Sequence, residues 1–315
     1  MAPASGLRPT RVAFVGQATF FEACSLGPGD HGLQPRFFEF RRDADAAALV
    51  DELQAFDADA VIVFRPEVIP AGALHGLRAR TVGFLTEPLP RQLSGDPVHE
   101  DLERRRRELG RVDATNFDRV VSFDPHIAAT ARDIVPVWRS LPLPVADRYF
   151  APLPLPASTV EGPKPLFVGR STPHRELLLA DAKHQFDLLH LAFGVDADGL
   201  ADAFATHDVG INLHNNPYPS FENRVCLHLA AGHLVFSESL DPSHGLEPGI
   251  DFVVVQTSGE LLNALVSLQR FPGVWHGVRV RGRRKAEQFR ASRVYPRLLH
   301  DLFLDLDAFG TARAA

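Results

Sequence analysis

A run of polar residues lies between a short apolar stretch and an apolar helical pattern in the second half of the chain. Residues 214–224 (HNNPYPSFENR) bring together an imidazole, three amides, a hydroxyl, a carboxylate and a guanidinium. Glu222 can accept hydrogen bonds from sugar or ribose hydroxyls, and Arg224 can neutralise a diphosphate. The residues of this loop that we expect to bind a polyhydroxylated, phosphorylated ligand are His214, Asn215, Asn216, Ser220, Glu222, Asn223 and Arg224.

The same loop also has a purely structural interpretation. Asparagine and proline are common in connections, and Ser220 or Asn223 could cap the helix that follows. A histidine at the end of a strand, such as His214, is often only a hydrogen-bonded structural residue. The two interpretations are compatible, because a capped loop can also bind a ligand.

A second candidate site follows an apolar stretch at residues 165–169 (PLFVG). Gly169 lets a ligand approach the backbone, the N-terminus of the next predicted helix favours an anion, and Arg170 can bind phosphate through two N–H groups. Ser171 and Arg175 can reach the same point. The spacing is neither that of a P-loop nor GxGxxG. We predict a phosphate contact here; the alternative is an ordinary strand–helix turn with a surface arginine.

Three residues in the first half of the chain are candidates for a general base. Glu22 lies on the segment after the first predicted strand, Glu87 follows the apolar run TVGFL, and His126 follows VVSF. A carboxylate or an imidazole at the carboxyl end of a strand can take a proton from an acceptor across a cleft. The residue pattern does not choose among the three.

Short apolar, β-branched stretches alternate with helical patterns and predict parallel α/β structure with strands covered on both faces. In the first half, strands are expected at 11–16, 35–40, 60–64, 81–85, 118–123 and 135–139, with a helix at 44–56. In the second half, strands are expected at 165–169, 186–193, 209–213, 234–236 and 252–255, with helices at 199–206, 224–231, 258–269 and 284–304. Seven prolines in residues 141–165 indicate the connection between the halves.

Composition narrows the function class. The chain has 315 residues, enough for two domains, and its net charge of −6 argues against a nucleic-acid partner. No apolar run has the length of a signal peptide or a membrane span, so we expect a cytoplasmic protein. Cys24 and Cys226 have no metal-type spacing and are expected to be buried thiols, with a disulfide between them as the alternative. No metal or bound cofactor is predicted. The basic clusters at 104–107 and 279–285 could touch a membrane surface or an anionic acceptor; solvated helix faces are the alternative.

Residues 208–240 (DVGINLHNNPYPSFENRVCLHLAAGHLVFSESL) resemble the C-terminal domain of GT-B glycosyltransferases, and most closely the CgeB-like, group 1 branch. The strand INLH, Arg224 and the pair Ala231–Gly232 carry this resemblance. LPLPVADRYFAP at 141–152 is similar to the interdomain turn of the family, and FVGR at 167–170 to its first C-terminal strand.

The resemblance implies two Rossmann-like domains facing across a cleft. Residues 1–150 would form the acceptor domain and residues 151–315 the donor domain, with the last helix able to pack back on the first. It also implies a nucleotide-sugar co-substrate beside Arg170 and Arg224, a small-molecule or glycan acceptor, and no obligatory metal. Family members carry a glutamate five residues before the glycine, where it holds the ribose of the donor; here that residue is Leu227.

The leading functional hypothesis is therefore glycosyl transfer (EC 2.4) from a nucleotide diphosphate sugar. One alternative is a nucleotide-sugar epimerase or hydrolase on the same fold. Another is a nucleotide-sugar binding protein without catalysis, which Leu227 would favour.

Overall fold

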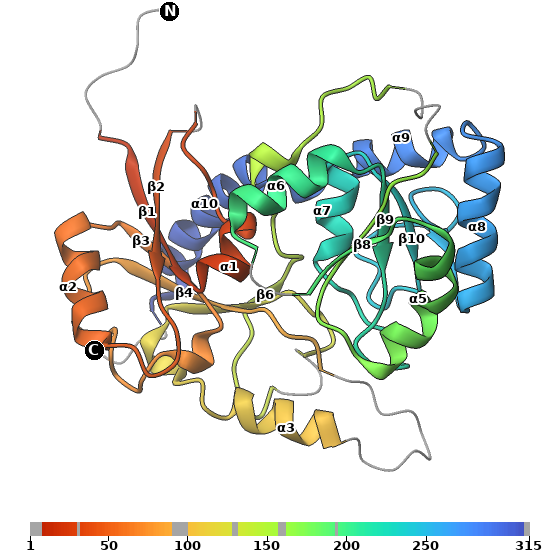
Figure 1. The fold of residues 1–315 in the computed structure, drawn as a ribbon. Helices are drawn as coiled ribbons and strands as arrows, with labels where there is room; N and C mark the ends of the chain where they lie inside the picture. Colours follow the sequence, from red (N-terminus) through yellow and green to blue (C-terminus); the bar gives the residue numbers. More distant parts are fainter. Residues whose placement is uncertain are drawn as a thin grey trace, which may run out of the picture.

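Each half of the chain folds around its own parallel β-sheet (Figure 1). The computed structural model describes residues 8–29, 32–89, 100–127, 132–156, 162–192 and 195–311. Two Rossmann-like sheets with helices packed against them confirm the expected α/β class.

The first sheet has the strand order β2-β1-β3-β4-β5-β6. In chain order these strands are β1 (Thr10–Gly16), β2 (Leu33–Glu39), β3 (Ala60–Phe64), β4 (Arg80–Leu85), β5 (Arg119–Ser122) and β6 (Arg139–Ser140), accompanied by the helices α1 (Ala18–Phe21), α2 (Ala46–Phe56) and α3 (Glu100–Leu109). Every side chain of β3 (AVIVF) is buried, as expected for a central strand with both faces covered.

The second sheet has the order β11-β10-β9-β7-β8. Its strands are β7 (Pro165–Val168), β8 (Leu189–Leu191), β9 (Val209–Asn212), β10 (Leu234–Ser237) and β11 (Val253–Val254), and its helices are α5 (Pro173–Gln185), α6 (Ala197–Thr206), α7 (Arg224–Ala230), α8 (Ser258–Arg270) and α9 (His276–Lys285). The strand expected at 186–193 is shorter than predicted, and Phe193 lies outside the described residues.

The helix expected at 284–304 is wrong as a single element. A 3-10 turn, η5 (Ala286–Phe289), follows α9, and Arg290 is extended at φ −62° and ψ 125°. The main helix, α10 (Ala291–Phe309), begins only after this break. The break arises because the segment pairs with the interdomain connection: Val145 N–H donates to Phe289 O, and Ala291 N–H donates to Val145 O, both at 2.8 Å.

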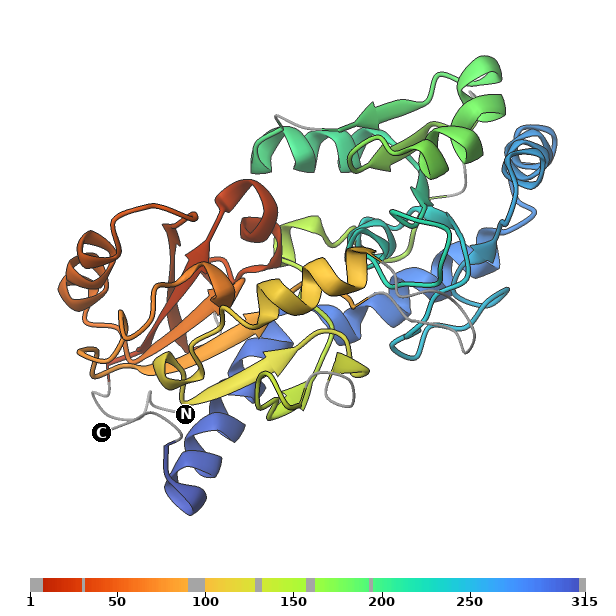
Figure 2. The ribbon, with the colours of Figure 1, turned by 90° about the horizontal axis from the view of Figure 1, so that it is seen from below.

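Helix α10 runs back along the first sheet, as Figures 1 and 2 show. Arg119 Nε donates to Asp305 at 2.6 Å, and Arg139 Nη1 donates to Asp301 at 2.7 Å. The buried Tyr295 hydroxyl donates to Cys24 O at 2.5 Å. These contacts tie the end of the chain to the half in which it began.

The sixth strand of the first sheet was expected at 135–139 but consists of Arg139 and Ser140 only. Val135 is buried in the core instead of pairing, and Pro136 has no N–H to donate to a neighbouring strand.

The basic run at 279–285 is not a wholly solvated helix face. Arg279 Nε donates to Gly232 O at 2.5 Å, and the buried Arg283 donates from Nε to Ala151 O at 2.8 Å. Both arginines therefore bind backbone carbonyls at and near the interdomain connection. None of the helices in the described ranges is long and apolar enough to cross a membrane.

Both cysteines are buried and free, as the sequence predicted. Burial raises the pKa of Cys24 to about 12, so its sulfur stays a thiol at neutral pH.

A buried pair of histidines lies beneath the second sheet. His233 Nε2 lies 2.8 Å from the Phe204 carbonyl, which can only accept, so this nitrogen carries the hydrogen. His233 Nδ1 is then the acceptor for His228 Nδ1–H at 3.0 Å. His228 Nε2 is buried and has no hydrogen-bond partner among the described residues. A second proton on His233 would bring two N–H groups face to face, and a second proton on His228 would charge a fully buried ring.

We expect acid to destabilise the protein through these rings. Burial lowers the pKa of His233 to about 4 and that of His228 well below its usual value. The unfolded chain therefore binds more protons than the folded one between about pH 6.5 and 4, and stability is lost as the pH falls through that range. Urea titrations at pH 7.5 and 5 should show a loss of about 2 kcal/mol per buried histidine.

The matched variants are His233→Gln and, as a control, the exposed His184→Gln. His233→Gln should reduce the pH dependence of the unfolding free energy, whereas His184→Gln should leave it as in the wild type. Equal pH dependence in all three proteins would contradict this explanation.

Candidate functional site

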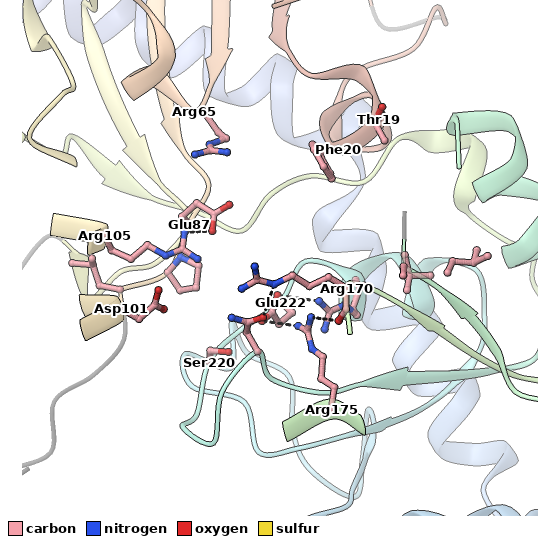
Figure 3. Close-up of a pocket in the computed structure, with 18 of the residues that line it drawn as sticks. Thr19, Phe20, Arg65, Glu87, Asp101, Arg105, Arg170, Arg175, Ser220 and Glu222 are labelled. Carbon is pink, nitrogen blue, oxygen red and sulfur yellow. Dashed lines mark hydrogen bonds and ion pairs between the residues drawn. The ribbon is translucent and has the colours of Figure 1, made fainter. Parts of the chain in front are cut away.

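A cavity of about 560 Å³ is lined by residues from both halves of the chain (Figure 3). On one side, its lining residues follow β1, β3 and β4 or belong to α3. On the other side, they end or follow β7 and β8, belong to α5 or α6, or lie in or at the end of the 214–224 loop after β9. The carboxyl ends of both parallel sheets thus meet here, which is where open α/β sheets bind ligands.

The second half contributes three arginines, Arg170, Arg175 and Arg224, together with Glu222 as the acidic residue among them. Figure 3 shows the labelled Arg170 and Arg175 close to Glu222. Gly169 makes this packing feasible: its φ is +151°, and a Cβ there would lie 3.0 Å from Arg224 Nη2. A side chain at this position would be strained and would displace the guanidinium.

Arg224, the first residue of α7, is held by the end of β9. Its Nη1 donates to Leu213 O at 2.8 Å and to Asn212 Oδ1 at 3.3 Å, and its Nη2 donates to Glu222 Oε2 at 3.2 Å. Its side chain is 12% exposed. The guanidinium is therefore fixed in orientation, with one edge lining the cavity.

Arg175 positions the neighbouring loops. Its Nε donates to Leu213 O and His214 O, its Nη1 to Arg170 O, and its Nη2 to Glu222 Oε1 at 3.5 Å. Burial, together with the charge of Arg224, lowers the pKa of Arg175 to about 9. Because its Nε, Nη1 and Nη2 all donate to protein oxygens, Arg175 contributes positive charge and holds the loops in place, and it has few N–H groups left for a ligand.

Arg170 is exposed and is held only through Nε, which donates to Asn215 Oδ1 at 3.0 Å. Its two Nη groups have no hydrogen-bond partner among the described residues. The adjacent helix α5 begins with a proline after Thr172, whose hydroxyl accepts from Arg175 N at 3.3 Å and donates to Asn215 O at 3.0 Å. Ser171 lies outside the cavity lining and donates to Glu176 at 2.6 Å.

The buried His214 side chain stabilises the 214–224 loop through two hydrogen bonds. Its Nε2–H donates to Ser239 O at 2.8 Å, so Nδ1 accepts from the Ser220 hydroxyl at 3.0 Å. Burial lowers the pKa of His214, which keeps the ring neutral. The buried Glu238 accepts from His214 N at 2.6 Å and lies 2.9 Å from His174 Nε2. This network holds the loop against β10.

The alternative that Ser220 or Asn223 caps α7 is wrong. The Ser220 hydroxyl is bonded to His214, and the Asn223 side chain makes no capping bond; its Nδ2 lies 3.1 Å from Cys24 Sγ. Of the predicted loop residues, Asn215, Ser220, Glu222 and Arg224 line the cavity; His214, Asn216 and Asn223 support it from behind or beside.

Of the three base candidates, Glu87 lines the cavity, whereas Glu22 and His126 are not among its lining residues. Glu22 lies 3.9 Å from Arg148, and His126 Nε2 lies 3.7 Å from Asp241. Glu87 accepts a hydrogen bond from Arg105 Nη1 on α3.

A hydrogen bond joins the two walls, in which Tyr218 OH donates to Asp101 Oδ2 at 3.0 Å. Burial raises the pKa of Tyr218 to about 12, so the phenol stays protonated and able to donate.

The sequence analysis missed Arg65, Asp101 and Tyr218 as cavity residues, and it named Arg105 only within the basic cluster that could touch an anionic acceptor. Arg65 directly follows the strand AVIVF and could have been found by the strand-end rule used elsewhere. Arg105 belongs to the basic cluster 104–107, and only its packing beside Glu87 distinguishes it from a solvated residue. Within the described ranges, no three His, Cys, Asp or Glu side chains are placed to hold a metal ion.

Neither a protein-family model nor a curated protein sequence matches the chain. Solved structures do. HepE of Anabaena in complex with UDP-glucose has a TM-score of 0.61 at 13% identity, over 93% of this chain and 99% of that one. Sucrose-phosphate synthase of Thermosynechococcus elongatus gives 0.57 at 13%, over 94% and 99%.

An α-glucosyltransferase in complex with UDP and a DNA 13-mer gives a TM-score of 0.57 at 12% identity, over 93% of this chain and 98% of that one. At such identities the similarity concerns the fold alone. The chain has the GT-B fold, with two Rossmann-like halves facing each other.

Proposed function

We propose that this protein is a glycosyltransferase that moves a sugar from a nucleotide diphosphate sugar to an acceptor held in the same cavity. The observation that carries the proposal is the clustering of Arg170, Arg175 and Arg224 on one wall of the cavity. Among the described residues, Glu222 is the one carboxylate of the cavity lining on that wall, and it accepts from Arg175 and Arg224. A surplus of fixed positive charge at the end of a sheet is suited to a diphosphate.

The arrangement suits the charge that develops during transfer. As the bond between the anomeric carbon and the diphosphate oxygen breaks, its electron pair leaves with the diphosphate. The free Nη groups of Arg170 and the cavity edge of Arg224 can stabilise that charge without rearranging, because other hydrogen bonds already orient both guanidiniums. In this proposal the arginines, not a metal ion, neutralise the leaving group.

The rest of the donor has surfaces to bind. Leu191, Ala192 and Val195 form an apolar side of the cavity against which a base can pack. Glu222, with both oxygens near arginines, is placed to accept from a donor hydroxyl. The structural neighbours crystallised with UDP or UDP-glucose support this class of donor.

The acceptor is assigned to the opposite wall, where we propose Glu87 as the general base. An acceptor hydroxyl attacks the anomeric carbon, a new C–O bond forms, and the hydroxyl proton passes to the carboxylate. Arg105 holds Glu87 through Oε2 and leaves Oε1 for this task.

Assignment to the CgeB-like, group 1 branch belongs to the same proposal and rests on Arg224 and the Ala231–Gly232 pair. Leu227 is 7% exposed, packs in the hydrophobic core and does not line the cavity. A nucleotide-sugar binding protein without turnover is therefore the second candidate, since the carboxylate expected at that position is absent.

The test is a thermal-shift screen with UDP, GDP, ADP, dTDP and CDP and their common sugar conjugates, followed by a sugar-release and transfer assay. A donor that binds only the folded chain raises the melting temperature by mass action. One nucleotide standing out, with turnover of its sugar conjugate, supports the transferase. Binding without turnover favours the second candidate, and no response from folded protein refutes both.

A further inference from the structure

The acceptor side of the cavity has guanidinium N–H groups that no described residue accepts. Its charged residues are Arg65, Glu87, Asp101, Arg104, Arg105 and Glu108. The acids already accept from neighbours: Arg105 donates to Glu87, Arg104 donates to Asp101 and Glu108, and Tyr218 also donates to Asp101. Some guanidinium N–H groups of Arg65 and Arg105 remain without a hydrogen-bond partner among the described residues.

Arg65 has the most distinctive conformation on this wall. It follows β3 directly and is left-handed at φ 60° and ψ 64°, which is uncommon for a residue other than glycine. Backbone strain of this kind gathers at functional sites, where surrounding contacts hold it. Here Arg65 N–H donates to Phe84 O at 3.1 Å.

The Arg65 side chain is held in place by Glu67. Its Nε donates at 2.8 Å to Glu67, whose side chain is only 7% exposed. Both Nη groups have no hydrogen-bond partner among the described residues, and Figure 3 shows the guanidinium directed toward the cavity. Although burial opposes it, the carboxylates of Glu67 and Glu87 raise the pKa of Arg65, so the group stays charged.

Arg105 is also held by a carboxylate, but through Nη1 instead of Nε. Its side chain is 15% exposed, its Nη1 is held by Glu87, and its buried Nε lacks a hydrogen-bond partner among the described residues. Because the Nε of Arg105 is buried, the groups that match the oxygens of an anion are the Nη groups of these two guanidiniums, each of which is held by one carboxylate.

We propose that the acceptor is a small, polar molecule bearing an anionic group, a phosphate or a carboxylate, which Arg65 and Arg105 bind. This inference rests on the proposed function, because it assigns the arginines of the first half to the acceptor and those of the second half to the donor diphosphate. An apolar substrate would leave these N–H groups without hydrogen-bond acceptors, and a neutral polar substrate would bind them without the charge assistance that an anion supplies.

The test measures binding of a second ligand while the donor site is occupied. With the best nucleoside diphosphate of the screen at saturation, calorimetry follows inorganic phosphate, glucose 6-phosphate, glucuronate and neutral glucose. We expect the anions to bind at least about tenfold more tightly than glucose. Phosphate compounds binding better than glucuronate would identify a phosphate, and the reverse order a carboxylate.

The variant is Arg65→Asn, since asparagine tolerates a left-handed backbone and the substitution should not strain the fold. It should weaken anion binding about tenfold or more while the nucleotide binds as in the wild type. Arg65→Lys, which keeps the charge without the planar fork, should be intermediate. The matched control is Arg80→Asn, which removes the same charge at the opposite end of the first sheet.

Three outcomes overturn the inference. Glucose binding as tightly as the anions, or unchanged anion binding in Arg65→Asn, refutes it while nucleotide binding leaves the proposed function standing. A folded wild type that binds no nucleotide refutes the proposed function and this inference with it.

Discussion

Replacement of Arg224 by alanine is expected to weaken nucleotide binding more than any other single change at the cavity. Charge-assisted hydrogen bonds to a diphosphate contribute about 2–4 kcal/mol in such a site, so affinity should fall about 30- to 700-fold. The variant also removes the 3.2 Å partner of Glu222 and leaves only the 3.5 Å contact with Arg175 to compensate this carboxylate beside the phosphates. Calorimetric titration with the nucleoside diphosphate identified in the screen measures the loss.

Arg224 also holds Leu213 O and Asn212, so the variant must be shown to fold by its melting temperature without ligand. Arg170→Ala provides a second measurement, because this exposed arginine holds only Asn215 and its removal spares the buried network. Arg41→Ala, at a side chain 68% exposed in the other half, is the control for loss of one positive charge. Wild-type nucleotide affinity in both Arg224→Ala and Arg170→Ala would contradict the assignment of the arginine cluster.

Gly210→Ala is expected to cause the largest loss of stability. Gly210 lies in β9, and a Cβ there would stand 2.3 Å from Cγ and 2.7 Å from Cβ of His228. Because these atoms lie next to the backbone of α7, the side chain cannot swing away and the helix must move. Overpacking of this kind costs about 3 kcal/mol or more, to be measured by urea denaturation. Since α7 begins at Arg224, the shift should also weaken nucleotide binding.

The matched control is Gly277→Ala in α9, where an added Cβ meets nothing within 4 Å. It should be neutral or slightly stabilising, since alanine is the better helix former. The double variant Gly210→Ala/His228→Ala should lose less stability than the sum of the single variants, because removing the ring removes the clash. Additive losses would show that the clash is not the cause.

Most strands and the interdomain connection were predictable because they depend on residues close together in the chain. Continuous apolar runs such as AVIVF at 60–64 indicate buried parallel strands, and the prolines of 141–165 indicate a connection. Polar residues immediately after such runs then belong to the ligand-binding edge of a sheet. That rule alone brought Gly169, Arg170, Glu222 and Arg224 to the cavity.

Predictions from local patterns failed where the conformation of a segment depends on contacts with residues far away in the chain. The helix expected at 284–304 breaks because Arg290 and its neighbours pair with Val145, far away in the chain. Arg283 looked like a surface residue and is buried on the Ala151 carbonyl. Neither contact leaves a trace in hydrophobic periodicity, which reports only how a segment divides between core and solvent.

The choice among the three base candidates shows most clearly what local patterns can predict and what depends on long-range contacts. Glu22, Glu87 and His126 all follow predicted strands, and the sequence treated them alike. Which of them faces the second half depends on how the two sheets are set against each other, and this is decided by the interdomain connection and by α10 packing back on the first sheet.

The sequence by itself thus determined the two sheets, the sheet edge at which the cavity lies and the arginines of its second-half wall, since each depends on residues close together in the chain. Only the tertiary structure decided that Glu87, Arg65 and Arg105 face those arginines across one cavity. The physical reason is that electrostatic and hydrogen-bond partnership depends on distance in space, and the contacts that set this distance join residues far apart in the chain.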